Sequence, residues 1–261
     1  MDDEERAGRR RHQELGLLTS ISLIVPCYNE AALLPRLLTT IDAARRAWRG
    51  DPSDLEVIVS DNASTDGTAA IAAAAGCRLA FTATRRIGAA RNAGAAIATG
   101  SILAFIDADS QVHAETFNFI ADCMARPDLV GGATGATMER WSLGTATCWM
   151  IMLPIALATG LDIGVVFCRR ADFEAIGGYD ETLKFAEDVK LLSDLRRLGR
   201  IRGARLVRRR RTAVAIASTR KFDQFGEWHF LGMLFKSPWY LLNRRAGDAF
   251  ADRYWYRSGR R

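Results

Sequence analysis

The sequence predicts an α/β protein in which a mostly parallel sheet is covered by helices. Short apolar runs alternate with helix-like stretches over residues 21–106, and this alternation of strand, helix and strand is typical of parallel sheets. The runs are apolar at successive positions, as in strands that are buried on both faces. Apolar residues make up 49% of the 261-residue chain, which is enough for one large core.

The first half of the chain is expected to hold four strands joined by three helices. The strands lie at 21–25, 55–60, 78–82 and 102–106, and the helices lie at 33–48, 68–75 and 87–98. The second half is less regular. We expect a helix at 114–125, a strand at 129–134, an apolar run at 141–159, a strand at 165–168, and helices at 172–176 and 187–198, the last ended by Gly199.

The charge and cysteine content narrow the class of partner and the compartment. The net charge is +6 and arginine supplies nearly all of the cations, so anionic partners are favoured: phosphorylated small molecules, acidic lipid headgroups or nucleic acid. Five cysteines are widely spaced and show neither a disulfide framework nor a zinc-binding spacing. This pattern favours a reducing compartment, so we expect a cytoplasmic location. Association of the protein with the inner face of the membrane is compatible with that location.

The two ends of the chain differ from its central part. Residues 1–17 are charged and are expected to form a mobile tail. Their arginines ahead of an apolar stretch resemble a signal peptide, but no small-residue cleavage site follows, so secretion is only an alternative.

Two apolar segments suggest contact with a membrane. The uncharged run at 148–159 is interrupted by Pro154 and is shorter than the roughly 20 residues that span a bilayer. Residues 223–261 are expected to form an amphipathic helical appendage, because 228–242 is rich in aromatic and apolar residues and has cations at its borders. A peripheral membrane contact through 228–245 is one interpretation. A helix packed on the domain or in a homo-oligomer is the other.

Two acids stand where a buried strand ends. Asp107 and Asp109 follow the apolar run at 102–106, and side chains two residues apart on a strand point the same way. Ligands of open α/β sheets bind at this edge, and a hard divalent cation is a common reason to place two carboxylates together. The alternative is that one of these acids caps the next helix.

The ends of the first two strands carry further candidates. Pro26, Tyr28 and Glu30 follow the first strand; Tyr28 is suited to stacking on a base and Glu30 to accepting a hydrogen bond from a ribose hydroxyl. Pro26 as a strand stop and Glu30 as a charge at a helix start are the alternatives. Asp61 ends the second strand and is placed to accept a hydrogen bond from a base, whereas Asp66 or Ser64 is expected to cap the next helix.

Two helix starts complete the set of candidates. Arg91 lies in a helix start that is rich in small residues, and such a start with guanidinium groups suits a diphosphate. Close helix packing is the alternative explanation for the small residues. Glu187 and Asp188 open a later helix, where acids are also favourable simply because of the helix dipole. No Ser-His-Asp or Cys-His arrangement is apparent among the three histidines.

In this order and spacing the motifs resemble those of the inverting GT-A glycosyltransferases of family 2. The resemblance covers residues 21–222. It rests on six segments: Val-Pro-Cys-Tyr-Asn-Glu at 25–30, Asp-Asn-Ala-Ser-Thr-Asp-Gly-Thr at 61–68, Ala-Arg-Asn-Ala-Gly at 90–94, Asp-Ala-Asp at 107–109, Gly-Gly-Tyr-Asp-Glu at 177–181 and Glu-Asp at 187–188.

The resemblance implies a fold, a reaction and a role for each matching position. The fold would be the Rossmann-like nucleotide-sugar transferase fold over 18–222, with a nucleotide-binding half at 18–110 and an acceptor half at 111–222. The enzyme would be a hexosyltransferase-like protein that moves a sugar from a nucleotide-diphosphate donor to the hydroxyl group of an acceptor. A lipid-linked molecule is one candidate for this acceptor. Pro26, Tyr28, Glu30 and Asp61 would bind the nucleobase and the ribose. Asp107 would contact the ribose or the metal, and Asp109 would bind Mg²⁺ or Mn²⁺. Asp188 would be the catalytic base that deprotonates the acceptor hydroxyl.

One departure from the family pattern bears on the reaction. Processive members carry a Gln-x-x-Arg-Trp element and several transmembrane helices, whereas this chain has Ser-Thr-Arg-Lys-Phe at 218–222. The resemblance therefore implies a single transfer, with Arg220 and Lys221 as candidates for phosphate binding. Asp162, in a glycine-flanked turn, is expected either on the acceptor side or as an ordinary turn residue.

Two competing functions are weaker. A sugar-phosphate nucleotidyltransferase would be expected to carry a glycine-rich basic loop after the first strand, where this chain has Pro-Cys-Tyr-Asn-Glu. The basic run at 205–211 is compatible with nucleic-acid binding. Because it precedes the apolar alternation at 212–217, a strand edge or a lipid-headgroup contact is favoured, and no nucleic-acid partner is expected.

Overall fold

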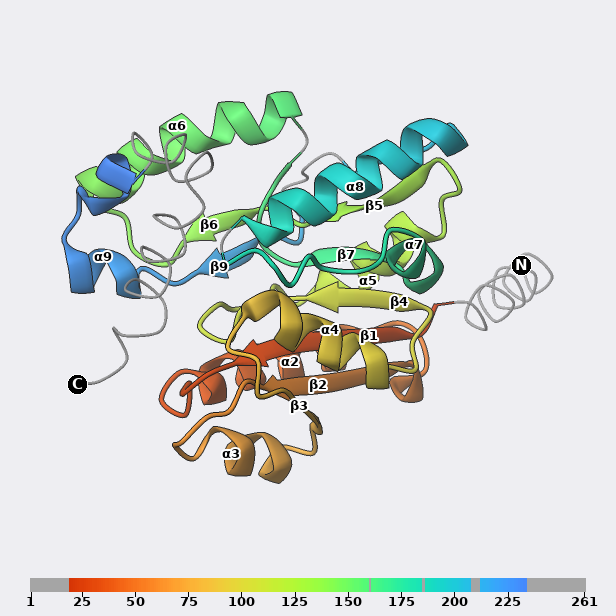
Figure 1. The fold of residues 1–261 in the computed structure, drawn as a ribbon, viewed down its shortest axis with the longest axis horizontal. Coiled ribbons are helices and arrows are strands. Elements are labelled where there is room, and N and C mark those ends of the chain that lie inside the picture. The colour runs from red at the N-terminus through yellow and green to blue at the C-terminus, as the bar shows by residue number, and fades with distance from the viewer. Residues whose placement is uncertain (1–18, 160, 185, 208–211, 234–261) are drawn as a thin grey trace, which may run out of the picture.

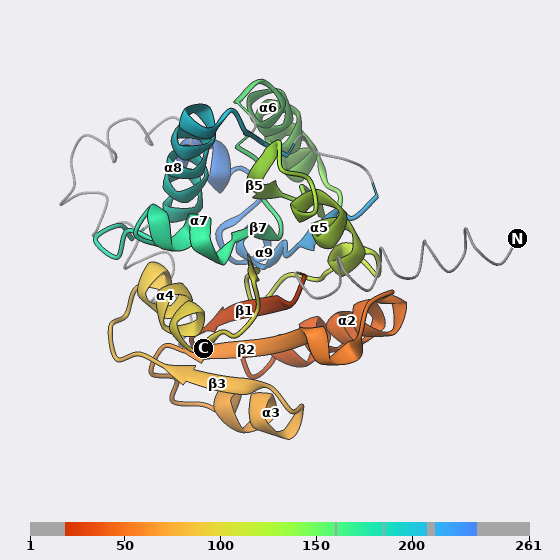
Figure 2. The same cartoon turned by 90° about the vertical axis from the view of Figure 1, so that its right-hand side faces the viewer.

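The computed structural model describes residues 19–159, 161–184, 186–207 and 212–233 (Figure 1). The predicted tail at 1–17, the arginines at 208–211 and most of the predicted appendage at 223–261 lie outside the described residues. Within them the chain forms a central sheet with helices packed on both faces, which Figures 1 and 2 show from two directions. This confirms the predicted α/β class.

The main sheet has seven strands in the order β3-β2-β1-β4-β7-β5-β8. Their bounds are β1 Ile21–Cys27, β2 Leu55–Asp61, β3 Arg78–Phe81, β4 Ile102–Phe105, β5 Leu129–Ala133, β7 Val166–Arg169 and β8 Arg205–Leu206. Strands β3, β2, β1 and β4 are parallel, and β7 runs antiparallel between β4 and β5. The prediction of a mostly parallel sheet is therefore confirmed. A separate parallel pair joins β6 Ala136–Met138 to β9 Ala215–Ala217.

Strand β1 lies in the middle of the parallel half of the sheet. Its burial explains why an apolar run in the sequence predicted a strand at this position. All seven of its residues are buried, because helices cover both faces of the sheet. Leu23 and Val25 pack in the cluster on one face, and Ile24 packs in the cluster on the other. On the Ile24 side a Cβ at Gly94 would lie 2.4 Å from Ile24 Cγ2, so only glycine lets the helix approach the strand this closely.

Helices from both halves of the chain cover the sheet. On one face lie α2 Leu34–Ala47, α3 Thr68–Ala74 and α5 Thr116–Met124, and on the other lie α4 Ile87–Ile97, α7 Arg170–Ala175 and α8 Glu187–Arg202. A short helix η1, Pro52–Asp54, precedes β2. The helices α6 Leu143–Thr159 and α9 Arg220–Phe225 complete the described part.

The prediction that Gly199 ends α8 is wrong. The helix continues to Arg202, and the cap is Gly203, whose φ of 70° is left-handed. Gly199 is required for a different reason: a Cβ there would lie 2.7 Å from the carbonyl oxygen of Ala204 and 3.0 Å from Val130 Cγ1. The glycine therefore lets α8 pack closely on β5 and on the chain that follows the helix. A sequence pattern cannot distinguish a glycine needed for close packing from one that ends a helix.

The apolar run at 141–159 forms the helix α6. Among the described residues no helix is both long and apolar enough to span a bilayer. Residues 229–233 are also helical, but the remainder of the segment predicted to contact a membrane, 228–245, lies outside the described residues.

Candidate active site

The carboxyl ends of β1 and β4 meet at one edge of the sheet, because the strands are parallel neighbours with Ile24 paired with Phe105. A cleft of about 390 Å³ opens there, a size that is usual for small-molecule sites. Most of the residues that the sequence predicts for the site line it: Pro26, Tyr28, Glu30, Asp107, Asp109, Glu187 and Arg220. The other three, Asp61, Arg91 and Asp188, lie beside or beneath the lining.

The loop after β1 presents an aromatic ring to the cleft. Tyr28 is half-buried, and the guanidinium of Arg85 lies 4.9 Å from the centre of its ring. This cation–π contact steadies the ring. One face of the ring is thereby covered by a cation, while the tyrosine as a whole contributes to the cleft wall.

The loop after β2 holds the loop after β1 in place. The backbone N–H groups of Asn29 and Glu30 donate to the hydroxyls of Ser64 and Thr68, at 3.0 and 2.9 Å. Asn29 has a left-handed φ of 55°, a conformation that asparagine tolerates better than most residues. Asp61 accepts a hydrogen bond from the N–H of Ser64 at 3.1 Å, so it supports the loop that positions Glu30.

Asp66 serves both loops. Its carboxylate accepts from the N–H of Thr68 at the start of α3, at 3.0 Å, and from the N–H of Ala31, at 3.1 Å. The N-cap of α3 is Gly67, which makes no side-chain capping bond, so the expectation that Asp66 or Ser64 is the N-cap is wrong. Asp66 instead joins the start of α3 to the loop after β1. Together these bonds fix the cleft edge that Tyr28 and Glu30 form.

Asp107 and Asp109 face the cleft from the end of β4, and a basic side chain lies between Asp109 and Glu30. Arg220 donates to both carboxylate oxygens of Glu30 at 2.9 Å and to Oδ2 of Asp109 at 3.1 Å. The Asp107 side chain is 52% exposed and that of Asp109 is 21% exposed. Burial, together with the Asp107 carboxylate, raises the pKa of Asp109 to about 6.

These carboxylates fit a divalent cation that is shared with a substrate. No group of three His, Cys, Asp or Glu side chains among the described residues is arranged to hold a metal by itself. Mg²⁺ is commonly bound through one or two carboxylates together with phosphate oxygens of a substrate. The repulsion between Asp107 and Asp109, visible in the raised pKa of Asp109, is the kind that a cation relieves.

Arg91 lies beneath the cleft, where it meets three carboxylates. It is 2% exposed. Its guanidinium lies 2.8 Å from Asp107 Oδ1, 2.8 Å from Glu187 Oε1 and 3.0 Å from Asp188 Oδ1. Arg91 was predicted to contact a substrate, but the structure instead places it as the buried counter-ion of the acids around the cleft. It thereby connects the end of β4 to the start of α8.

Asp188 lies in the first turn of α8, directly behind the cleft wall. The helix begins after Ala186, whose left-handed φ is 59°, so the chain turns sharply before it presents Glu187 and Asp188. Asp188 Oδ1 accepts a hydrogen bond from the hydroxyl of Tyr179 at 2.7 Å. Burial raises the pKa of Asp188, although Arg91 opposes the shift. A carboxylate with a raised pKa is a better proton acceptor near neutral pH.

The sequence missed several residues of the site. Tyr179 lies in a motif that the sequence singled out, but its contact with Asp188 depends on how the chain folds between them. Lys184 lines the cleft from the same connection, and Phe230 and Met233 form an apolar part of its wall. Asp162 does not line the cleft; it is 7% exposed and accepts from the N–H of Ile163 at 2.9 Å.

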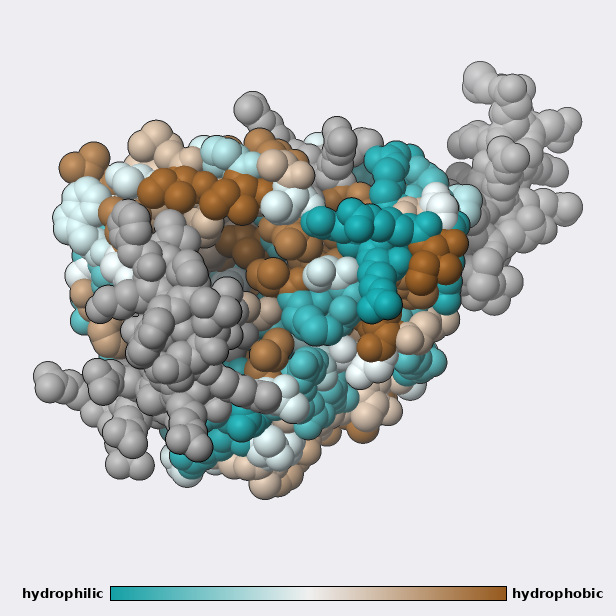
Figure 3. All heavy atoms as spheres, turned by 45° about the horizontal axis from the view of Figure 1, so that its top comes forward, coloured by the Kyte–Doolittle hydropathy of each residue, from teal (hydrophilic) through white to brown (hydrophobic). Residues whose placement is uncertain are grey.

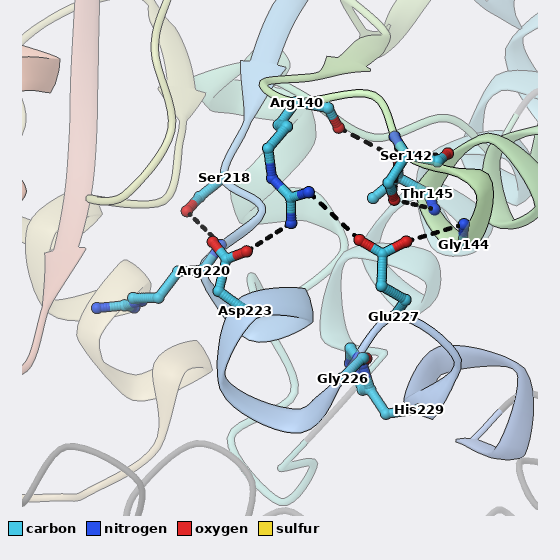
Figure 4. Close-up of polar contacts among 10 residues, drawn as sticks. All are labelled: Arg140, Ser142, Gly144, Thr145, Ser218, Arg220, Asp223, Gly226, Glu227 and His229. Atoms are coloured by element: carbon cyan, nitrogen blue, oxygen red, sulfur yellow. Dashed lines mark hydrogen bonds and ion pairs between the residues drawn. The ribbon is translucent and has the colours of Figure 1, made fainter.

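The helix that carries Arg220 is fastened to the start of α6, as Figure 4 shows. Arg140 pairs with Asp223 on α9 and, at 3.3 Å, with Glu227. The other oxygen of Glu227 accepts from the N–H of Gly144 at 3.1 Å. Arg220 points away from this group of contacts, toward Glu30 and Asp109. The position of the cleft residue Arg220 therefore depends on contacts with α6.

Comparison with known proteins gives a family match over the first part of the chain. Residues 22–159, slightly more than half of the sequence, match the model described as "Glycosyl transferase family 2". An uncharacterized glycosyltransferase of Mycobacterium tuberculosis is 35% identical over 114 residues, which are 43% of this chain and 48% of that protein. The chain thus matches about half the length of this relative. Validoxylamine A glucosyltransferase of Streptomyces hygroscopicus is 38% identical over 93 residues, 33% of this chain and 20% of that protein.

Solved structures share the fold. Glucosyl-3-phosphoglycerate synthase from Mycobacterium tuberculosis, in complex with Mn²⁺, UDP and glucosyl-3-phosphoglycerate, superimposes with a TM-score of 0.59 at 20% identity, over 87% of this chain and 82% of that one. A mannosyltransferase from Pyrobaculum calidifontis, in complex with GDP-Man and Mn²⁺, gives 0.59 at 20% identity, over 81% and 66%. At these identities the likeness establishes the GT-A fold.

Proposed function

The chain belongs to glycosyltransferase family 2, and we propose that it moves a sugar from a nucleotide-diphosphate donor to an acceptor hydroxyl. The transfer inverts the anomeric carbon, occurs once per acceptor and uses a divalent cation. One observation carries the proposal: acids from β4 and α8 and an arginine from α9 line one cleft at the carboxyl edge of the sheet. Without this shared cleft, the donor, the cation and the catalytic base would not be brought together.

The nucleoside of the donor is assigned to the β1 side of the cleft. Pro26 and Tyr28 line that side, and an aromatic ring offers a stacking surface for a base. Glu30 offers oxygens to ribose hydroxyls, but in the described state Arg220 occupies both of them. Asp61 supports this side from below through its bond to Ser64.

Asp107 and Asp109 are assigned to the diphosphate side, where they would hold Mg²⁺ or Mn²⁺. When bound, the cation supplies positive charge against the charge that develops on the departing nucleoside diphosphate. Two of the solved relatives contain Mn²⁺ together with UDP or GDP-Man, in agreement with this assignment. Arg220 and Lys221 line the same part of the cleft and would meet phosphate oxygens.

Asp188 is assigned the role of base, with Glu187 beside it in the cleft wall. The acceptor hydroxyl loses its proton to Asp188 as the oxygen attacks the anomeric carbon from the face opposite the leaving diphosphate. This direct displacement inverts the configuration. Tyr179 and Arg91 hold Asp188 in place through Oδ1.

Purified protein incubated with UDP-, GDP- and dTDP-sugars tests the proposal. We expect thermal stabilisation by one nucleotide class in the presence of Mn²⁺, and slow release of that nucleoside diphosphate with water as acceptor. NMR of the first sugar released should show the anomeric configuration opposite to that of the donor. Release or consumption of pyrophosphate would instead indicate a nucleotidyltransferase, and retention of configuration would refute the direct displacement.

The acceptor and the location of the enzyme belong to the same proposal. A lipid-linked hydroxyl acceptor at the inner face of the membrane would fit a peripheral contact through residues 228–245. The described part of that segment, up to Met233, contributes Phe230 and Met233 to the cleft wall. Extraction of membranes and analysis of the lipids glycosylated by the enzyme would test this part separately.

A further inference from the structure

The helix α6 is an uncharged helix with little protein beneath it. Its 17 residues contain no Asp, Glu, Lys or Arg. Only Gly144, Thr145 and Cys148 are buried, and all three lie in its first two turns. The remaining turns run over the body of the protein without another buried residue. An apolar helix of a globular protein is normally covered, so this one needs an explanation.

Its exposed side chains form one stripe. Leu143, Met150 and Leu157 are 73%, 63% and 60% exposed, and their spacing of seven residues places them on nearly the same side of a helix. That side is opposite the buried residues. Ile151 and Ile155, at 37% and 48% exposed, lie seven residues after Gly144 and Cys148 and therefore on the side of the buried residues, so in the second half of the helix that side is partly exposed as well. The stripe extends about 20 Å, from the rise of about 1.5 Å per residue.

A basic helix lies beside this stripe. The side chain of Arg196 on α8 donates to the carbonyl oxygen of Thr159, the last residue of α6. Arg197 and Arg200 of α8 are exposed, and neither forms an ion pair within the described part of the chain. Figure 3 shows the result on one face of the molecule: apolar residues over α6 and hydrophilic residues over α8.

We infer that α6 and the exposed arginines of α8 dock on the surface of an anionic lipid bilayer. The stripe would enter the boundary between headgroups and acyl chains, and the body of the protein would replace the polar face of an interfacial helix. Arg197 and Arg200 would meet the phosphates, where each basic residue adds to the attraction. The inference goes beyond the proposed function and does not depend on it, since no donor or acceptor is involved.

Two other occupants fit less well. A stable dimer interface usually takes about 20–30 residues from each partner, far more than the three residues of the stripe and the two arginines beside it. The chain segment 234–261 carries seven Lys and Arg residues against two Asp, so its charge is the same as that of the face it would have to cover. The same charge favours an anionic bilayer.

Docking through α6 would also bear on the cleft. The start of α6 is bonded to Glu227 and, through Arg140, to Asp223 of α9 (Figure 4). Arg220, on the same short helix, reaches Glu30 and Asp109. A membrane surface under α6 would therefore lie next to the part of the chain that closes one side of the cleft.

Co-sedimentation of the full chain with vesicles tests the inference. The vesicles contain phosphatidylcholine mixed with phosphatidylglycerol, or phosphatidylcholine alone. The double variant Met150→Ser/Leu157→Ser should lower the partition coefficient on the mixed vesicles at least about tenfold, because two large apolar side chains no longer enter the interface. Phe81→Ser is the matched control. Phe81 is 67% exposed on β3, at the opposite end of the sheet (Figure 1), and its loss should change nothing.

The charged half of the surface is tested in parallel. Arg197→Gln/Arg200→Gln should lower binding to the mixed vesicles about tenfold and leave the weak binding to phosphatidylcholine alone unchanged. Arg46→Gln, an exposed arginine of α2, is its control. All of these positions are exposed, so thermal unfolding should be unaffected in every variant.

Three outcomes would overturn the inference. The first is a wild-type chain that does not bind the mixed vesicles. The second is stripe variants that bind as well as the wild type, which would assign any binding to another segment such as 234–261. The third is a wild-type dimer in light scattering that the stripe variants convert to monomer while vesicle binding is unchanged, which would assign the stripe to a second copy of the chain.

Discussion

Replacing Arg91 by methionine tests whether the acids around the cleft depend on one buried cation. Arg91 is 2% exposed and lies within 3.0 Å of Asp107, Glu187 and Asp188. Methionine fills much of the same volume but carries no charge, so three carboxylates would remain close together without a counter-ion. Breaking a buried ion pair by removing one partner typically costs about 3–5 kcal/mol. We expect a loss of that size in the free energy of unfolding.

Urea unfolding followed by tryptophan fluorescence measures this loss. Domains of this kind are stable by about 5–15 kcal/mol, so the variant should still fold. The control is Arg45→Met, which removes an exposed pair with Asp42 at 3.6 Å and should cost about 0–1 kcal/mol. Arg91→Lys should fall between the two, because a single ammonium cannot reproduce the fork of contacts that a guanidinium makes.

The pH dependence provides a second test of the same variant. Burial raises the pKa values of Glu187 and Asp188 even with Arg91 present. An acid whose pKa is higher in the folded than in the unfolded state destabilises the fold when ionised, and this cost disappears as the pH falls below the folded pKa. Without Arg91 the pKa values should rise further. The deficit of Arg91→Met should therefore shrink as the pH is lowered from about 8. A deficit below about 1 kcal/mol at pH 8, or one that grows on acidification, would refute the reasoning.

Three further changes test the site and the packing. Asp188→Asn should lower the rate of sugar transfer or donor hydrolysis about 10²- to 10⁴-fold in a coupled nucleotide-release assay. The affinity for the nucleotide, measured by calorimetry, should stay the same. A loss of nucleotide affinity as large as the loss of rate would contradict the role of Asp188 as a catalytic base. Asp109→Asn should abolish the Mn²⁺-dependent part of the thermal stabilisation by nucleotide, and in the wild type that part should fade as the pH falls through about 6, because a protonated carboxyl is a poor ligand. Gly199→Ala should destabilise the protein by about 1–3 kcal/mol in urea, although alanine is the better helix former, because its Cβ would lie 2.7 Å from a carbonyl oxygen; a gain in stability would show that the helix can move away.

The parallel half of the fold was predictable because each of its strands and helices has a recognisable local sequence pattern. Strand β1 is apolar from Ile21 to Val25 except at Ser22, whose hydroxyl donates to Glu56. Both faces of the strand are covered, so a run of apolar residues with a single polar interruption identifies it. Parallel neighbours must end at the same edge, and the acids after β4 therefore had to lie near Glu30 after β1. The cleft lining confirms this convergence for seven of the predicted residues. Their chemical roles stay predictions, since side-chain placement alone does not assign them.

The remainder of the site depends on contacts between distant segments, which no local pattern reports. Arg91 looks like a cleft residue in sequence because it lies in the first turns of a helix rich in small residues. In the structure its side chain is instead buried against Asp107, Glu187 and Asp188. Tyr179 reaches Asp188 only because the connection from 180 to 186 ends in a left-handed turn at Ala186. Gly199 carries the same signal as a helix stop, although it is needed for close packing.

The charges around the cleft explain how Arg220 relates to its predicted role. Below the acids, Arg91 is buried and fixed by three carboxylates. On the open side, Arg220 is 40% exposed and its partners are Glu30 and Asp109. Asp109 Oδ2 accepts from Arg220 at 3.1 Å, and a cation bound to this carboxylate would bring a second positive charge close to the guanidinium. We therefore expect Arg220 to turn from Asp109 toward the diphosphate when a donor binds with its cation, because the phosphate oxygens would offer the guanidinium a new anionic partner. Phosphate binding by Arg220 thus stays a prediction that its place on the open side supports, whereas Arg91, enclosed beneath the cleft, is held by three carboxylates.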